Sequence, residues 1–166
     1  MLSAKLQDAM NKQINAELFS AYIYLSMSAY FEDKTLRGFA NWMRVQAQEE
    51  VGHAMRFYDF IVDRLGRVLL APIAKVPTEW PSTLAAFESA FAHEQKVTGM
   101  INDLMTLAVA EGDHAAVSFL KWFVDEQVEE ESQADEIVQQ LKLAGDNGAA
   151  LLILDREMAG RKAEEE

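Results

Sequence analysis

The sequence predicts an all-α protein, a four-helix bundle with a long crossover between its second and third helices and a short fifth helix. Four long segments place apolar residues at alternating steps of three and four, the spacing that faces a bundle core. All three prolines fall between residues 72 and 81, so they interrupt the chain at one place. The 166 residues are 50% hydrophobic, which suits one domain with a sizeable core, and we assign residues 1–166 to it.

The first two helices are predicted to form an antiparallel pair. The first begins after Ser3, a good N-cap residue, and continues to about residue 33. The second covers about residues 38–65 and ends before Gly66, because glycine suits the position that follows a helix. The short link between them leaves room for no other arrangement than antiparallel neighbours.

The third and fourth helices are predicted to form a second pair of the same kind. The third begins after Pro81-Ser82-Thr83 and ends near residues 111–113, and the fourth covers about residues 114–144. The bundle therefore spans about residues 3–144. A glycine-rich turn at 145–148 precedes a short fifth helix at about 149–159, and we expect residues 161–166 to form a frayed tail.

The connection from Gly66 to Ser82 is long enough to pass along the whole bundle. Its seventeen residues reach roughly 55 Å at ~3.3 Å per extended residue. A helix of about 28 residues is only about 42 Å long. The second and third helices are therefore predicted to be parallel, and the apolar residues 68–73 of the link are expected to pack against the bundle.

Each of the four core-facing stripes is apolar toward its ends and polar in its middle. The midpoints of the helices lie near residues 18, 52, 98 and 130, and in an antiparallel arrangement they share one height. Buried carboxylates repel each other and lose hydration, at a cost of several kcal/mol each. A pair of divalent cations would relieve this cost, and one histidine among carboxylates suits Fe(II), Mn(II) or Zn(II). The residues near the midpoints are Glu17, Glu50, His53, Glu94, Gln127 and Glu130.

Each of these residues also has a simpler interpretation when it is taken alone. A single Glu-x-x-His, such as Glu50 and His53, usually lies on a helix surface, and Glu17 would suit a buried hydrogen-bond network. Their coincidence on four helices at one level favours a metal centre. His93 and His114 lie off the stripes and are expected to be solvated, while the methionines are expected to fill the core rather than to bind haem.

Composition excludes several classes of function. Against 27 acidic residues there are 15 Lys and Arg, a net charge of −12, which disfavours nucleic acid and anionic membranes as partners and favours cations. The chain has no cysteine, hence no disulfide, thiolate zinc site or Fe–S cluster. It has no apolar run of membrane-spanning length and no hydrophobic signal-peptide region at its start, so we expect a cytoplasmic protein.

Several segments of the chain resemble the non-haem ferritins of bacteria and archaea. The resemblance covers nearly the whole length and extends to the acidic positions above. The matching segments are Gln13-Ile14-Asn15-Ala16-Glu17, Asn41-Trp42-Met43-Arg44, Glu49-Glu50, His53-Ala54-Met55, His93-Glu94 and Glu126-Gln127-Val128-Glu129-Glu130-Glu131.

The resemblance implies a ferroxidase centre that holds two irons. Glu17, Glu50 and His53 would bind the first iron, with Glu50 bridging to the second. Glu94 and Glu130 would bind the second iron.

The resemblance further implies groups around this centre. Gln127 would lie near the second iron, and Tyr24 would lie beside the centre as an electron donor. Glu49, Glu126 and Glu129, with Glu130 shared, look like ligands of a third iron site. The alternative interpretation of these three acids is an ordinary solvated acidic face.

An iron-storage function is therefore expected. Such a ferritin oxidises Fe(II) with O₂ or peroxide and stores the ferric mineral in a hollow shell of 24 subunits. No haem is expected, because bacterioferritins have a methionine where this chain has Val51. The apolar cluster at residues 151–154 independently favours association. Two alternatives stay open, a di-iron or di-manganese oxidoreductase and a shell with a degenerate centre.

Overall fold

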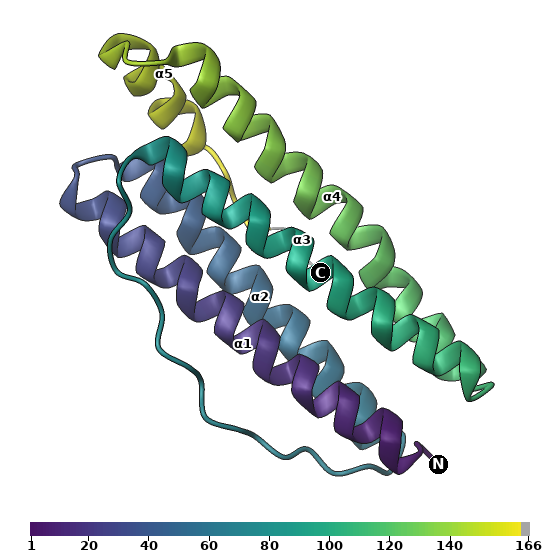
Figure 1. The fold of residues 1–166 in the computed structure, drawn as a ribbon. Helices are drawn as coiled ribbons and strands as arrows, with labels where there is room; N and C mark the ends of the chain where they lie inside the picture. The colour runs from purple at the N-terminus through teal and green to yellow at the C-terminus, as the bar shows by residue number, and fades with distance from the viewer. Residues whose placement is uncertain (164–166) are drawn as a thin grey trace.

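The computed structural model describes residues 1–163, and this part of the chain contains five helices and no strand (Figure 1). The predicted all-α class and the four-helix bundle with a short fifth helix are confirmed. The expected tail at 161–166 falls partly outside the described residues. The helices are α1 (Ala4–Asp33), α2 (Arg37–Asp63), α3 (Thr83–Ala110), α4 (His114–Ala144) and α5 (Gly148–Met158).

Helices α1 and α2 form one antiparallel hairpin, and α3 and α4 form the other (Figure 1). Side-chain caps define the beginnings of these helices. Ser3 accepts a hydrogen bond from the Leu6 amide, as expected, and Ser82 accepts one from the Ala85 amide. The N-cap residue of α2 is Leu36, whose side chain cannot accept a hydrogen bond from the helix. Instead, Asp155 of α5 accepts a hydrogen bond at 3.0 Å from the Phe39 amide.

The end of α2 differs from the sequence prediction by two residues. The helix ends at Asp63, and the left-handed residue after its C-cap is Leu65, with φ of 59°, rather than Gly66. Gly66 has a different reason to be glycine. A Cβ atom there would lie 2.8 Å from the Gln7 side chain and 2.9 Å from that of Ile61.

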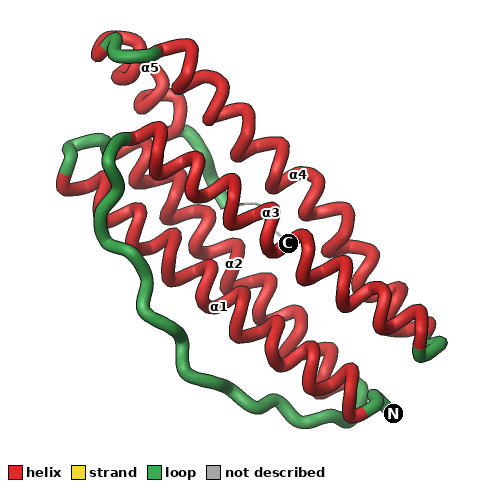
Figure 2. The backbone as a smooth tube through the Cα atoms, in the orientation of Figure 1, coloured by secondary structure: helices red, strands yellow, loops and turns green. Residues whose placement is uncertain are grey.

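The crossover at residues 64–82 runs along the outside of α1 (Figure 2). It is held mainly by polar side chains of α1: Asn11 donates to the Arg67 carbonyl at 3.0 Å and Asn15 to that of Ala71 at 3.1 Å. Contrary to expectation, most of the apolar side chains in 68–73 do not pack inward, since Leu69 and Leu70 are exposed. The crossover delivers the chain to the end where α2 begins, so α2 and α3 are parallel, as predicted.

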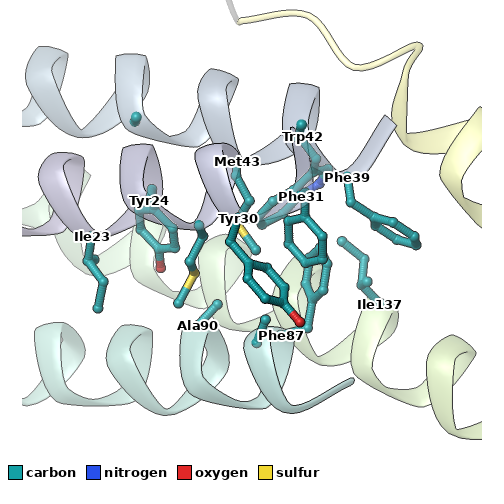
Figure 3. Close-up of a cluster of buried hydrophobic side chains, with 14 of the residues drawn as sticks. Ile23, Tyr24, Tyr30, Phe31, Phe39, Trp42, Met43, Phe87, Ala90 and Ile137 are labelled. Carbon is teal, nitrogen blue, oxygen red and sulfur yellow. The ribbon is translucent and has the colours of Figure 1, made fainter. Parts of the chain in front are cut away.

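The apolar core is divided into two clusters by a polar layer. At the end near α5, the rings of Phe31, Phe39 and Phe87 lie with centroids 5.4–5.7 Å apart (Figure 3). At the opposite end, Phe57 and Phe123 pack with aliphatic residues. The buried carboxyl, amide and imidazole side chains of the bundle lie between these clusters, whereas buried Ser28 lies beside Ala40 of the cluster near α5. None of the helices in the described residues is both long and apolar enough to cross a membrane.

Candidate metal centre

Three potential ligands from the first hairpin converge in the polar layer. Glu50 and His53 share one face of α2, and His53 Nδ1 lies 3.4 Å from Glu50 Oε2. Glu17 approaches from α1, and one ligand atom from each of the three lies within 4.8 Å of the others. All three side chains are buried, at no more than 2% exposed. These are the three residues that the resemblance implies as ligands of the first iron.

The second hairpin contributes Glu94, Gln127 and Glu130, which are also buried. Gln127 Nε2 lies 3.3 Å from a carboxylate oxygen of Glu94, and it also donates to Thr98 Oγ1 at 3.2 Å. Tyr24, on α1, donates its hydroxyl hydrogen to Glu94 Oε1. The predicted second-iron residues and the predicted electron donor therefore lie together.

Two glutamines complete the layer, and the sequence analysis did not single them out. Gln13 Nε2 donates to Glu17 Oε1 at 2.8 Å. Gln46 Nε2 donates to Glu130 Oε2 at 2.6 Å and to Glu50 Oε1 at 3.3 Å, so it joins the two hairpins. A usable signal exists in the sequence, because each glutamine precedes a stripe glutamate by four residues, one helical turn.

Burial of four carboxyl groups in one layer changes their protonation. Desolvation, reinforced by the neighbouring Glu50, holds the pKa of Glu17 well above its usual value. Desolvation and the charges of Glu94 and Glu130 do the same to the pKa of Glu50. Burial also raises the pKa of Glu94, and it raises the pKa of Glu130 to about 8. A centre without cations therefore favours protonated carboxyls.

Two carboxylate oxygens in this layer fit a cation. Glu17 Oε2 and Glu50 Oε2 are buried and have no hydrogen-bond partner in the part of the chain described. A buried polar atom without a partner costs about 1–3 kcal/mol. With His53 beside them, the two oxygens offer the oxygen-and-nitrogen ligand set that suits divalent iron, manganese or zinc.

Comparison with known proteins decides the family. The model of the ferritin-like domain family matches residues 7–144. The chain belongs to the ferritin family. The predicted resemblance to prokaryotic non-haem ferritins is therefore confirmed.

Curated relatives and solved structures agree with this assignment. This ferritin is 46% identical over 161 residues to a bacterial non-heme ferritin of Bacteroides fragilis, covering 97% of this chain and all of the relative. It is 37% identical over 166 residues to one from Staphylococcus aureus, with full coverage of both. The open-pore ferritin of the archaeon Archaeoglobus fulgidus superimposes with a TM-score of 0.97 at 51% identity, over 98% of this chain and 100% of that one. Family membership supports iron storage as the general function.

The three acids predicted at a third iron site line one pocket of the ferritin, of about 870 Å³. Glu126 comes nearest to the centre, with Oε1 3.9 Å from His53 Nε2, and it forms a potential ligand group with His53 and Glu130. Glu129 is exposed and accepts a hydrogen bond from Gln133 at 3.1 Å. Glu49 forms an ion pair with Arg161, with Oε2 2.6 Å from Nη2.

The prediction of a solvated histidine is wrong for His93 and confirmed for His114, which is exposed. His93 lies partly buried between α1 and α3, with Nε2 2.7 Å from Ser20 Oγ. Burial, aided by the charge of Lys96, lowers its pKa to about 4. Its ring contacts that of Tyr24, with centroids 6.0 Å apart. It is thus a neutral neighbour of the centre.

Proposed function

We propose that the protein oxidises Fe(II) to Fe(III) with O₂ or peroxide at a two-iron centre within each subunit and stores the ferric product in a hollow shell of 24 subunits. The observation that carries the proposal is the pair of buried oxygens, Glu17 Oε2 and Glu50 Oε2, that accept no hydrogen bond and lie beside His53. Iron is the substrate in this proposal. A cation at this position would form ligand bonds with these two buried oxygens and so remove the cost of burying them without a hydrogen bond.

In the proposed centre, Glu17, Glu50 and His53 bind the first iron, and Glu94 and Glu130 bind the second. Glu50 lies between the two, which the electrostatic influence of Glu94 and Glu130 on its pKa supports. Because the carboxyls have raised pKa values, iron binding displaces protons from them.

The two ions together supply two electrons to one oxidant molecule. Each Fe(II) loses one electron, so no single-electron oxygen radical needs to leave the site. The hydrogen bond from Tyr24 to Glu94 supports the proposal that Tyr24 supplies a further electron to the bound oxidant. Gln127 holds the Glu94 carboxylate from the opposite side.

Glu49, Glu126 and Glu129 form the proposed third iron site. Their common pocket lies next to His53 and Glu130, so it offers iron a place to bind beside the two-iron centre. This arrangement supports transfer of the ferric product from the bundle toward a storage space.

The outer face of α5 supports assembly. Leu151 and Leu154 pack against the bundle, whereas Leu152 and Ile153 are 53% and 59% exposed. Adjacent exposed aliphatic side chains favour contact with another protein surface. The similar archaeal protein is described as an open-pore ferritin, which fits a shell for this chain as well.

Anaerobic Fe(II) titration followed by exposure to air tests the oxidation. The parent is expected to oxidise two Fe(II) per subunit rapidly and then to accumulate mineral, whereas the double variant Glu50→Ala with His53→Ala loses the rapid phase. A matched control, Asp103→Ala with His114→Ala, removes one exposed carboxylate and one exposed imidazole and is expected to behave as the parent. Equal oxidation rates in parent and centre variant would refute the assignment.

Two further measurements separate storage from other functions. Native mass spectrometry is expected to give a mass near that of 24 subunits. Measurement of mineral growth is expected to show iron accumulating beyond two ions per subunit, whereas a protein that oxidises the metal pair but builds no mineral would be a di-iron oxidoreductase.

A further inference from the structure

The chain beyond α5 turns back toward the middle of the bundle and is fastened to α2 (Figure 1). Asn41 on α2 donates to the main-chain carbonyls of Met158 and Arg161, at 3.2 and 3.1 Å. The Arg161 guanidinium lies over the ring of Trp42, 4.3 Å from its centroid, and Nη1 donates to the Trp42 carbonyl at 3.3 Å. The tail residue that we expected to fray therefore has a defined position.

The guanidinium reaches the edge of the metal centre. Its Nη2 donates to Glu49 Oε2 at 2.6 Å and to Gln46 Oε1 at 2.8 Å. The Arg161 and Glu49 side chains are only 16% and 15% exposed, so solvent screens this pair much less than a surface pair.

The same contact determines how Gln46 is oriented. A guanidinium only donates hydrogen bonds, so the Gln46 atom that faces Arg161 must be the oxygen. The amide nitrogen of Gln46 must then face Glu130 and Glu50, as the distances of 2.6 and 3.3 Å show. Arg161 is thus connected to the carboxylates of the two-metal layer through one side chain.

We propose that Arg161 is an internal counter-cation of the third metal site, which a metal ion must displace from Glu49 before it can use that carboxylate as a ligand. The proposal rests on the proposed function, since it assumes that Glu49 binds metal. A guanidinium and a divalent cation compete for the same oxygen, and they repel each other because solvent only partly screens charges at these largely covered side chains. The third ion is therefore held more weakly than its acidic ligands alone would allow. Weak binding suits a site that passes ions onward.

Zn(II) calorimetry on the assembled, metal-free protein tests this idea without any redox step. Arg161→Gln is expected to raise the affinity of the third Zn(II) per subunit about tenfold, or about 1.4 kcal/mol. Arg161→Lys keeps the charge but loses the fork of donors, so it is expected to give a smaller increase. Lys162→Gln removes the charge of an exposed neighbour that lines the same pocket; it is the control and is expected to raise the affinity much less than Arg161→Gln does.

A double-mutant cycle separates competition from a loosened tail. In a Glu49→Gln background, Arg161→Gln is expected to have no further effect on Zn(II) affinity. The proposal is overturned if Arg161→Gln leaves the third affinity unchanged, if Lys162→Gln raises it equally, or if the Arg161 effect persists without Glu49. A parent that fails to bind Zn(II) at Glu50 and His53 would instead contradict the proposed function.

Discussion

The ends of the bundle and its middle layer are buried to the same degree, yet they are built from opposite kinds of side chain. Phe31, Phe39 and Phe87 at one end are fully buried, and so is Phe57 at the other. The carboxylate Glu50 in the middle layer is 1% exposed. Burial stabilises the folded state at the ends, whereas it costs free energy in the middle unless protons or cations compensate.

This contrast separates the source of stability from the source of function. The two apolar clusters hold the helices in place, and they therefore keep the middle carboxylates together even when no cation binds them. Changes at the ends should alter stability, and changes in the middle should alter metal binding. Four predictions examine that separation.

The largest expected effect is at the apolar end near α5. Phe87 is fully buried against Phe31, Phe39 and Trp42, so Phe87→Ala is expected to lower the free energy of unfolding by about 3–5 kcal/mol. Denaturant unfolding of the metal-free protein measures this loss. Leu143→Ala is the control, because Leu143 is 88% exposed. A similar change in both variants would contradict the assignment of stability to the cluster.

The second effect is the loss of metal affinity at the middle layer. Substituting residues that merely support metal ligands costs 10–100-fold in affinity, so replacing a ligand should cost on the order of 100-fold or more. Glu50→Gln is expected to weaken Zn(II) binding by this amount. Its metal-free form should be at least as stable as the parent, because glutamine cannot ionise in the buried layer. Glu88→Gln, at an exposed ion pair with Lys142, should change neither quantity. If the metal-free Glu50→Gln protein were less stable than the parent, the claim that the middle layer serves metal binding rather than stability would be contradicted.

The third effect is a pH dependence that only the middle layer should produce. The pKa of Glu130 is about 8 in the folded protein, above the usual 4.5, so its stabilising contribution is complete below pH 4.5 and is lost as the pH rises through 8. One such group changes stability by up to about 1.4 kcal/mol per pH unit.

Unfolding of the metal-free protein between pH 6.5 and 8 measures this slope. In this window the opposite contribution of His93 is small and fades as the pH rises, because its pKa of about 4 makes stability fall mainly as the pH drops below 6.5. Glu130→Gln is expected to flatten the parent's decline. An equally steep decline in that variant would assign the slope to other groups.

The smallest expected effect concerns the cap that α5 places on α2. Asp155→Ala removes the acceptor of the Phe39 amide and is expected to cost about 1 kcal/mol of unfolding free energy. Arg156→Ala, at an exposed residue of the same helix that does not line the acidic pocket, is the control. Metal affinity should stay unchanged in both variants. A large loss of Zn(II) binding in Asp155→Ala would show that α5 supports the centre as well as the end.

Much of this arrangement was predictable because helical periodicity and short loops act locally. The spacing of three or four residues along a helix determines that Glu17 and Glu94 face the bundle core. The short loop between two helices determines the level at which residues of the adjacent helix lie. The contact between Glu49 and Arg161 spans 112 positions and belongs to no repeat, so the sequence offers no sign of it. His93 was misjudged because a position off one helix's core stripe can still be covered by a neighbouring helix, here through Ser20.

The route of the crossover has a consequence for how the centre is assembled. Because residues 64–82 pass outside the bundle, the two hairpins meet in the middle layer without a covalent connection there. The proposed ligands are divided between the hairpins, with Glu17, Glu50 and His53 on one and Glu94 and Glu130 on the other. A metal pair bound between the hairpins would add to the hold of the apolar clusters, so the affinity for metal and the stability of the contact between the hairpins are thermodynamically linked.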